Sequence, residues 1–294
     1  MHNIDLINPE TFELANGLPV TLAGEFCSAR PYSAIVFLAK CGLYTENAEN
    51  NGITHALEHI LFKGSNKYSN YDLTSIINKL GGSIDAFTTS DSLGIEVLVP
   101  HGRIDDALEV LSQLALKPAF PEDEIELEKK VIIEEMRFYR DDPEDLVMLK
   151  LEKSCYKGSC YSREILGTPE SVSRLNKKTL GDYHRNYFTP SNCSLTIAGS
   201  FDVKKNAGNG GKAFRAGGME TRRFAGEKLR LPQTGQLRRP LLHEKERKIH
   251  SELLRDRISD AFVAQRRAHI FDVPSIRLFV AEILAAFIYA QRRI

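Results

Sequence analysis

The chain contains 294 residues, and its 39 basic side chains balance its 39 acidic ones, so that the formal net charge is zero. This length allows one large or two modest domains. Five cysteines without paired spacing argue against a secreted disulfide framework, and no basic and apolar leader opens the sequence, so we expect a cytoplasmic protein. The one strongly apolar run, 276–290, includes Arg277 and Glu282 and is too short to span a membrane.

Strands and helices alternate along the first 200 residues. Asn16 and Gly17 predict a turn between two opening strands, and a second hairpin is expected further along the chain. The predicted strands are 12–14, 18–22, 34–39, 84–88, 93–99 and 193–198. The predicted helices are 51–62, 70–80, 103–116, 122–140, 142–156 and 177–186. This mixture predicts an α+β fold in which an antiparallel sheet is layered with helices.

Two histidines one helical turn apart carry the clearest functional signal, in the sequence His55-Ala56-Leu57-Glu58-His59. Residues i and i+4 lie above one another on a helix, so both imidazoles can reach one zinc ion. Glu58 lies beside this pair but points away from it, which suits a base acting on metal-bound water. The alternative is a pair of surface histidines on an ordinary helix. Apolar residues form the opposite face, so the histidines must face solvent, a cleft or another element.

A second helix offers a third ligand, which zinc needs in addition to two histidines and a water. Helical periodicity over 122–140 gives a core stripe at Ile125, Ile132, Met136 and Tyr139. Glu135 borders this stripe, whereas Glu134 points into solvent. We therefore predict Glu135 as the third ligand; the alternative is an edge carboxylate without a metal.

Other motifs accompany these residues, and 76 positions separate His59 from Glu135. They are Leu61-Phe62-Lys63-Gly64, the runs 81–88 and 131–136, Ile165-Leu166-Gly167, and the runs 187–192 and 195–199. With this set, residues 10–202 resemble the inverted-motif (H-x-x-E-H) zinc peptidases of the pitrilysin type, peptidase family M16. That family includes insulin-degrading enzyme, the mitochondrial processing peptidase beta subunit, and short bacterial and archaeal homologues.

The resemblance implies a zinc-dependent endopeptidase that hydrolyses extended or unstructured polypeptides. One Zn²⁺ per chain would be held by His55, His59 and Glu135, with Glu58 as the general base on zinc-bound water. Glu128, seven positions before Glu135, matches the family's second glutamate, which supports the catalytic site from just outside the ligands. The expected partners are a peptide substrate and a second subunit, in a homodimer or in a heterodimer with a related M16 subunit.

The resemblance also places a substrate-binding edge strand at 84–88, with Asp85, Ala86 and Phe87 as the substrate-binding residues. Gly81 and Gly82 precede this run, and a polar turn follows it, as expected for a hairpin. An edge strand can accept an extended peptide by main-chain pairing. The alternative is an ordinary sheet strand without a ligand.

The composition changes after Asp202. Residues 1–202 hold 19 Lys and Arg against 30 Asp and Glu, a net charge of −11, whereas residues 203–294 hold 20 against 9, a net charge of +11. We predict a zinc metallopeptidase N-terminal domain at 1–202 and a Gly- and Arg-rich linker at 203–240. Residues 241–294 are predicted to be a helical, truncated or aberrant segment of a second domain.

Three interpretations of this tail stay open: a divergent, truncated second domain, an aberrant translation with little stable structure, or a basic partner-binding appendage. Nucleic-acid binding is not expected, because no stacking aromatics alternate with the arginines. Two functions follow from these alternatives. The chain is an active zinc endopeptidase, or it is a zinc-binding but catalytically silent subunit that needs a partner domain to complete the cleft.

Overall fold

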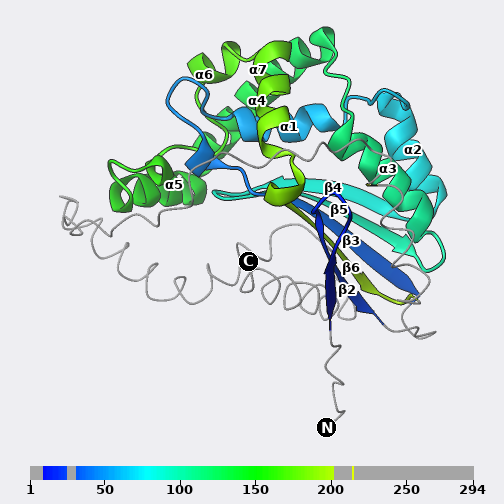
Figure 1. The fold of residues 1–294 in the computed structure, drawn as a ribbon. Helices are drawn as coiled ribbons and strands as arrows, with labels where there is room; N and C mark the ends of the chain where they lie inside the picture. Colours follow the sequence, from blue (N-terminus) through cyan, green and yellow to red (C-terminus); the bar gives the residue numbers. More distant parts are fainter. Residues whose placement is uncertain (1–8, 25–30, 202–213, 215–294) are drawn as a thin grey trace.

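The computed structural model describes residues 9–24, 31–201 and 214 (Figure 1). A six-stranded sheet carries a layer of helices on one face. Its strands are β1 (Glu10–Glu13), β2 (Pro19–Gly24), β3 (Tyr32–Ala39), β4 (Ser83–Thr88), β5 (Leu93–Pro100) and β6 (Cys193–Gly199). The helices are α1 (Ile53–Leu61), α2 (Asn70–Lys79), α3 (Ile104–Leu116), α4 (Glu122–Asp141), α5 (Pro143–Cys155), α6 (Pro169–Ser173) and α7 (Lys177–Tyr187). Three short 3₁₀ helices lie at Leu43–Thr45, Cys160–Ser162 and Pro190–Asn192.

The predicted α+β architecture is confirmed, with one difference in the sheet. The strand order is β1-β2-β6-β3-β5-β4, and every neighbouring pair is antiparallel except β2 and β6, which run parallel. A parallel pair requires a long crossover instead of a hairpin. Here the crossover between β2 and β6 contains every other described element except β1. The pairing of β2 with β6 therefore brings the two ends of this long segment together in the middle of the sheet. β4 lies at one edge, as predicted for the strand expected to bind substrate.

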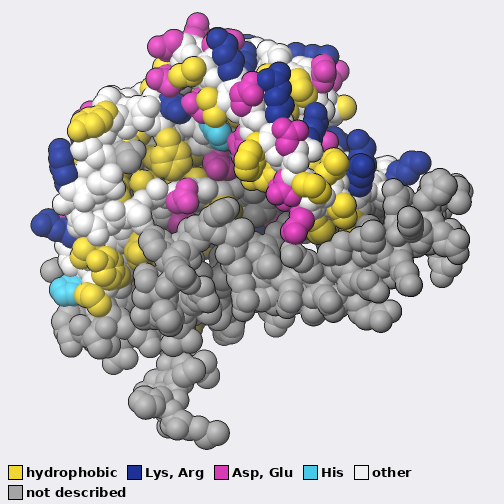
Figure 2. All heavy atoms as spheres, turned by 180° about the vertical axis from the view of Figure 1, so that it is seen from behind, with side chains coloured by type: hydrophobic (Ala, Val, Ile, Leu, Met, Phe, Trp, Pro, Cys, Tyr) yellow, Lys and Arg dark blue, Asp and Glu magenta, His cyan; other side chains and the backbone are white. Residues whose placement is uncertain are grey.

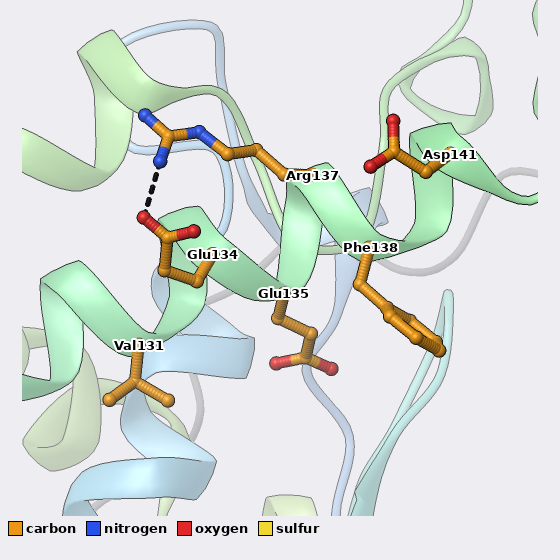
Figure 3. Close-up of a pocket in the computed structure, with 6 residues that line it drawn as sticks. All are labelled: Val131, Glu134, Glu135, Arg137, Phe138 and Asp141. Atoms are coloured by element: carbon orange, nitrogen blue, oxygen red, sulfur yellow. Dashed lines mark hydrogen bonds and ion pairs between the residues drawn. The ribbon is translucent and has the colours of Figure 1, made fainter.

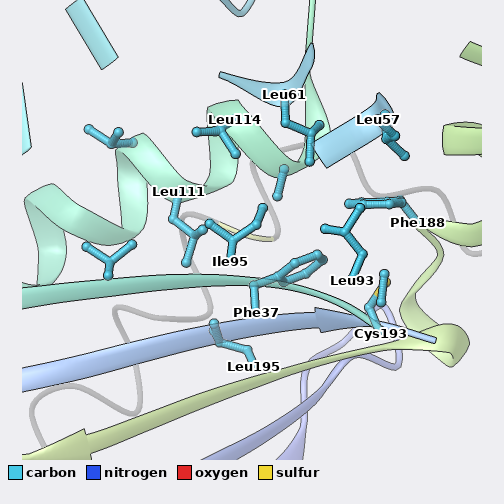
Figure 4. Close-up of a cluster of buried hydrophobic side chains, with 14 of the residues drawn as sticks. Phe37, Leu57, Leu61, Leu93, Ile95, Leu111, Leu114, Phe188, Cys193 and Leu195 are labelled. Atoms are coloured by element: carbon cyan, nitrogen blue, oxygen red, sulfur yellow. The ribbon is translucent and has the colours of Figure 1, made fainter. Parts of the chain in front are cut away.

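The hydrophobic core lies between the sheet and the helices (Figure 4). Phe37 and Leu195, from neighbouring central strands, face Leu111 and Leu114 of α3 and Leu57 of α1. All five side chains are fully buried. Because α1 presents its apolar face to this core, its opposite face is left for polar residues.

The predicted boundary at residue 202 passes close to a residue that belongs to the same core. Phe214, within the predicted linker, is fully buried, and its ring stacks on Phe37 with the ring centroids 5.5 Å apart. The remainder of the predicted linker at 203–240 and all of the predicted segment 241–294, including the apolar run 276–290, lie outside the described residues. Among the residues described, no helix is long and apolar enough to cross a bilayer.

Candidate metal centre

Helix α1 begins at a tightly built turn. Gly52 has a φ of 87°, and a Cβ there would lie 2.4 Å from the carbonyl oxygen of Leu166, so only glycine fits. The buried carboxylate of Glu46 accepts hydrogen bonds from the backbone N–H of Gly52 at 2.8 Å and of Thr54 at 3.0 Å. The Asn51 side chain donates a third at 2.9 Å. An anion at this position satisfies the free N–H groups of the helix and its positive end. The result is a fixed starting point for the helix that carries both histidines.

His55 and His59 face helix α4 across the gap between the two helices. Nε2 of His55 lies 3.2 Å from Oε2 of Glu135, and Nε2 of His59 lies 3.6 Å from the same oxygen. The sequence left solvent, a cleft or another element as what the histidines face, and in the structure they face another element. Only 8% of the surface of His55 and 19% of the His59 side chain are exposed, so these are not surface histidines on an ordinary helix.

The donor set fits a zinc ion. In the described part of the chain, one group of His, Cys, Asp or Glu residues brings three ligand atoms within 4.8 Å of one another: His55, His59 and Glu135. Ligands about 2.1 Å from a tetrahedral zinc lie about 3.4 Å apart. The two measured distances from Glu135 to the imidazoles, 3.2 and 3.6 Å, lie on either side of that value. Two imidazoles and one carboxylate are also a ligand set typical of zinc hydrolases.

Glu128 holds the far side of the His59 ring. Its Oε2 lies 2.8 Å from Nδ1 of His59, while its Oε1 lies 2.6 Å from the ammonium of Lys63. A carboxylate at Nδ1 favours the tautomer in which Nδ1 carries the proton, so Nε2 keeps the lone pair that a metal needs. Glu128 is buried within α4, and its ion pair with Lys63 compensates for that burial.

Glu58 lies on the other side of the histidine pair. Its Oε2 is 3.7 Å from Nδ1 of His55, and the hydroxyl of Thr88 donates a hydrogen bond to the same oxygen. Glu58 therefore lies beside the histidine pair and outside the group of three candidate ligands. Both recorded contacts of the carboxylate go to Oε2.

The carboxylates and imidazoles change one another's protonation. Burial disfavours a charged ring at His55, but the carboxylates of Glu135 and Glu58 outweigh burial and raise the pKa of His55 to about 9. Hydrogen bonds from His55 and His59 lower the pKa of Glu135 to about 2. Burial opposes ionisation of Glu128, yet Lys63 and His59 keep its pKa below the ordinary value. The site is thus rich in negative charge that attracts a proton or a metal cation.

The two adjacent glutamates of α4 leave the helix in different directions (Figure 3). Glu134 is exposed and forms an ion pair with Arg137, whereas Glu135 points toward the histidines. This is the separation that helical periodicity predicts. Glu135 also borders an open pocket of about 640 Å³, whose lining residues are Val131, Glu134, Glu135, Arg137, Phe138 and Asp141. Acidic and apolar side chains border a recess containing a histidine on one face of the molecule (Figure 2).

Comparison with known proteins matches this site to one family. The sequence model of the insulinase family, peptidase family M16, matches residues 28–169. This range includes the two histidines and the three glutamates described above: His55, His59, Glu58, Glu128 and Glu135. The chain belongs to peptidase family M16.

Two curated relatives illustrate the match of this M16 chain. It is 33% identical to an uncharacterised zinc protease of Bacillus subtilis over 190 residues, which cover 63% of this chain and 46% of the relative. It is 29% identical to a probable mitochondrial-processing peptidase subunit beta of Arabidopsis thaliana over 201 residues, covering 68% of this chain and 38% of the relative. The chain thus spans less than half the length of either relative.

Solved structures share the M16 fold. A protease from Helicobacter pylori superimposes with a TM-score of 0.70 at 22% identity, covering 78% of this chain and 54% of that chain. A peptidase M16 inactive domain from Pseudomonas fluorescens superimposes with a TM-score of 0.69 at 17% identity, covering 77% and 54%. These similarities support the fold alone, since both identities are low.

The predicted substrate-binding residues of this M16 domain lie on β4. Asp85, Ala86 and Phe87 occupy the middle of the strand, which pairs with β5 on one side and is the last strand of the sheet on the other. Ala86 packs against the core, whereas Phe87 lies on the opposite face, where its ring fills the space beside Gly94. A peptide that pairs with this edge would therefore meet main-chain groups rather than one uniform row of side chains.

Sequence reasoning missed three residues that build the M16 site: Glu46, Lys63 and Thr88. Lys63 follows His59 by one helical turn, a spacing that could have indicated it. Thr88 ends a predicted strand and lies two residues after Ala86, so both side chains are on the helix side of the sheet. The predicted core stripe of α4 was wrong at Tyr139, which is 39% exposed. The buried part of α4 ends at Met136, so the last turn of the helix extends beyond the core. Glu128 is buried in the stripe instead.

Proposed function

We propose that this chain is a zinc-dependent endopeptidase that hydrolyses extended or unstructured polypeptides. The observation that carries the proposal is the convergence of His55, His59 and Glu135: their ligand atoms lie within 4.8 Å of one another, and the Glu135 oxygen lies from both imidazole nitrogens at distances close to those expected around a tetrahedral zinc. The curated relatives named as zinc proteases, in Bacillus subtilis and in Rickettsia felis, support the metal and the reaction class.

One Zn²⁺ per chain would be held by these three residues. When bound, zinc supplies Lewis-acid chemistry, which polarises a peptide carbonyl and makes water a better nucleophile. The roles of the chain's own residues follow from their positions. Glu58 takes the proton from the attacking water and delivers it to the leaving amine. Glu128 keeps the His59 ring oriented through the contact at Nδ1.

The substrate would be an extended peptide that pairs with the edge of β4 to which no other described strand is bonded, along Asp85, Ala86 and Phe87. β4 ends at Thr88, which contacts Glu58, so a peptide on this edge runs past the base. A cytoplasmic location belongs to the same proposal and rests on the unpaired spacing of the cysteines.

A second candidate function is a zinc-binding subunit that is catalytically silent alone. One observation favours it: a peptidase M16 domain from Pseudomonas fluorescens that is named inactive shares the fold of this chain. In that case a homodimer, or a heterodimer with a related M16 subunit, would complete the cleft. The word subunit in the name of the Arabidopsis relative is in keeping with such an assembly.

Metal analysis and peptide cleavage test both functions. The purified chain should contain one zinc per molecule, and His59→Ala should lose most of it, because two protein ligands hold zinc poorly. Glu134→Gln, which alters a neighbouring carboxylate that faces solvent, is the matched control and should keep the metal. Undiminished zinc in His59→Ala would refute the metal site.

Cleavage of an unstructured fluorogenic peptide, with and without a full-length M16 homologue, separates the two candidates. Chelator-sensitive cleavage by the chain alone supports the endopeptidase. Zinc binding with cleavage only after the homologue is added, and lost again when the chain carries Glu58→Gln, supports the subunit.

A further inference from the structure

Thr88 connects the edge strand to the catalytic helix. Its backbone pairs with Leu93 of β5, which holds it in the sheet. Because side chains alternate along a strand, Thr88 points to the same side as Ala86 and Ile84, both of which pack on the core beneath the helices. β4 packs against α1 on this side, and the Thr88 hydroxyl reaches the Glu58 carboxylate.

The contact is selective for one oxygen of Glu58. An ionised carboxylate only accepts hydrogen bonds, so the hydroxyl must be the donor, and it donates to Oε2. The ring of His55 lies nearest to the same oxygen, at 3.7 Å, which is too long for a direct hydrogen bond. Among the described residues, the hydroxyl of Thr88 thus makes the short hydrogen bond to this carboxylate.

We propose that Thr88 is a positioning residue, which holds Oε2 of Glu58 so that Oε1 is aimed at the attacking water. The proposal rests on the proposed function, since Glu58 is a base only if the chain hydrolyses peptides. A hydrogen bond to a charged acceptor is stronger than one between neutral groups, so one hydroxyl can restrict an otherwise rotatable side chain. The structural requirement at this position is only a residue that suits a strand, and the β-branched carbon of threonine already meets it.

The position of Thr88 also links substrate binding to the base. It is the last residue of the strand whose free edge is proposed to pair with the peptide. A peptide that pairs with β4 adds main-chain hydrogen bonds to it and thereby restrains Thr88. The same event then restrains the Glu58 carboxylate. Thr89 does not share this role, because its hydroxyl bonds to Asp91 and Ser92 within the turn that follows.

Three variants separate the hydroxyl from the strand. Thr88→Val keeps the shape and the β-branch but removes the donor, while Thr88→Ser keeps the donor. Thr11→Val removes an exposed strand hydroxyl from β1, at the opposite edge of the sheet, and is the matched control. All three should bind one zinc per chain, which shows that the ligands are undisturbed.

Two measurements decide the proposal: the kinetics of peptide cleavage, with a full-length M16 homologue added where the chain needs one, and crystal structures of the zinc-loaded wild type and Thr88→Val. We expect Thr88→Val to lower kcat about 10- to 100-fold with little change in KM, because the base is misplaced by about 1 Å. Thr88→Ser should restore most of kcat. In the crystals, Glu58 should leave its wild-type conformation in Thr88→Val.

An unchanged kcat in Thr88→Val, or a Glu58 carboxylate that keeps its single wild-type conformation there, overturns the positioning role. A wild-type chain that cleaves nothing even with the homologue refutes the proposed function instead. The two crystal structures then still decide whether Thr88 holds Glu58.

Discussion

Helix α1 meets carboxylates in two places, at its N-terminus and along the face that carries its histidines, and the two places differ in what those carboxylates face. At the N-terminus, Glu46 accepts three hydrogen bonds from N–H groups of the chain itself, all between 2.8 and 3.0 Å. Along the histidine face, Glu135 and Glu128 face the imidazoles of His55 and His59.

The two places differ in how the carboxylates are satisfied. N–H groups donate to the carboxylate of Glu46, so the chain itself satisfies it. On the histidine face, Lys63 and Nδ1 of His59 can donate to Glu128, but Nε2 of each histidine faces the Glu135 carboxylate, and two lone-pair acceptors that face one another need a proton or a metal cation between them. Burial alone does not distinguish the two places, because Glu46 and His55 are buried to a similar degree.

The largest effect is expected on the histidine face of α1, at Glu58. Glu58→Gln keeps the size of the side chain but cannot accept a proton, so turnover should fall on the order of 10²- to 10⁴-fold. Zinc content should stay at the wild-type value, because Glu58 lies beside the ligands and outside the group of three. Steady-state cleavage and metal analysis of the same preparation check both. Equal loss of zinc would make Glu58 a ligand, and near-normal cleavage would require another base.

A change at the N-terminus of α1 should instead lower the stability of the fold. Glu46→Gln keeps the shape but turns one acceptor oxygen into a donor that faces N–H groups, which leaves buried donors without partners. We expect the free energy of unfolding to fall by about 3 kcal/mol, the order found when charged, buried hydrogen bonds are broken. Chemical denaturation of the metal-free protein measures this. A loss below about 1 kcal/mol would show that Glu46 does not anchor α1.

A third histidine sharpens the comparison, because His184 of α7 is buried and has no carboxylate partner among the residues that the structure describes. Its Nε2 lies 2.8 Å from the carbonyl oxygen of Ala115, and its ring stacks on Phe188. Burial lowers the pKa of His184 from the ordinary 6.5 to about 4, and the nearby Arg185 charge acts in the same direction. His184 is therefore neutral in the folded chain at neutral pH.

This difference gives His184 a pH effect of known sign. Between pH 6.5 and 4 the unfolded chain binds a proton at His184 that the folded chain refuses, so stability falls as the pH is lowered through this range. The loss at pH 5 should be about 2 kcal/mol, and above pH 6.5 this residue contributes no pH dependence. His184→Gln, compared with wild type by denaturation at pH 5 and pH 7.5, should remove that part of the acid sensitivity. An identical pH dependence in the variant would contradict a neutral His184.

Local patterns account for what the sequence could predict. Periodicity placed His55 and His59 on the polar face of α1, and it separated Glu135 from Glu134, because both results depend only on helix geometry. The edge position of β4 also followed from resemblance. The contacts that a fold creates between distant residues were not predictable from periodicity.

Three examples show where that limit lies. The parallel pairing of β2 with β6 joins strands about 170 positions apart, beyond the reach of hairpin signals. Thr88 meets Glu58 only because the sheet edge passes beneath α1. Phe214, in a stretch whose composition indicates a linker, is buried against Phe37.

The smallest effect is expected at Glu134, the exposed neighbour of Glu135. Glu134 is 68% exposed in its side chain, and its ion pair with Arg137 is an i,i+3 pair on the surface of α4. Such pairs contribute between 0 and about 1 kcal/mol, so Glu134→Gln should change the free energy of unfolding by less than about 1 kcal/mol. Its zinc content and its turnover should match the wild type, whereas Glu135→Gln, one position along the same helix, should lose most of the metal. Denaturation curves and metal analysis of the two variants side by side test this. Loss of zinc from Glu134→Gln with retention by Glu135→Gln would mean that α4 presents Glu134, and not Glu135, to the histidines. Glu134 would then replace Glu135 in the contrast between the histidine face of α1 and its N-terminus.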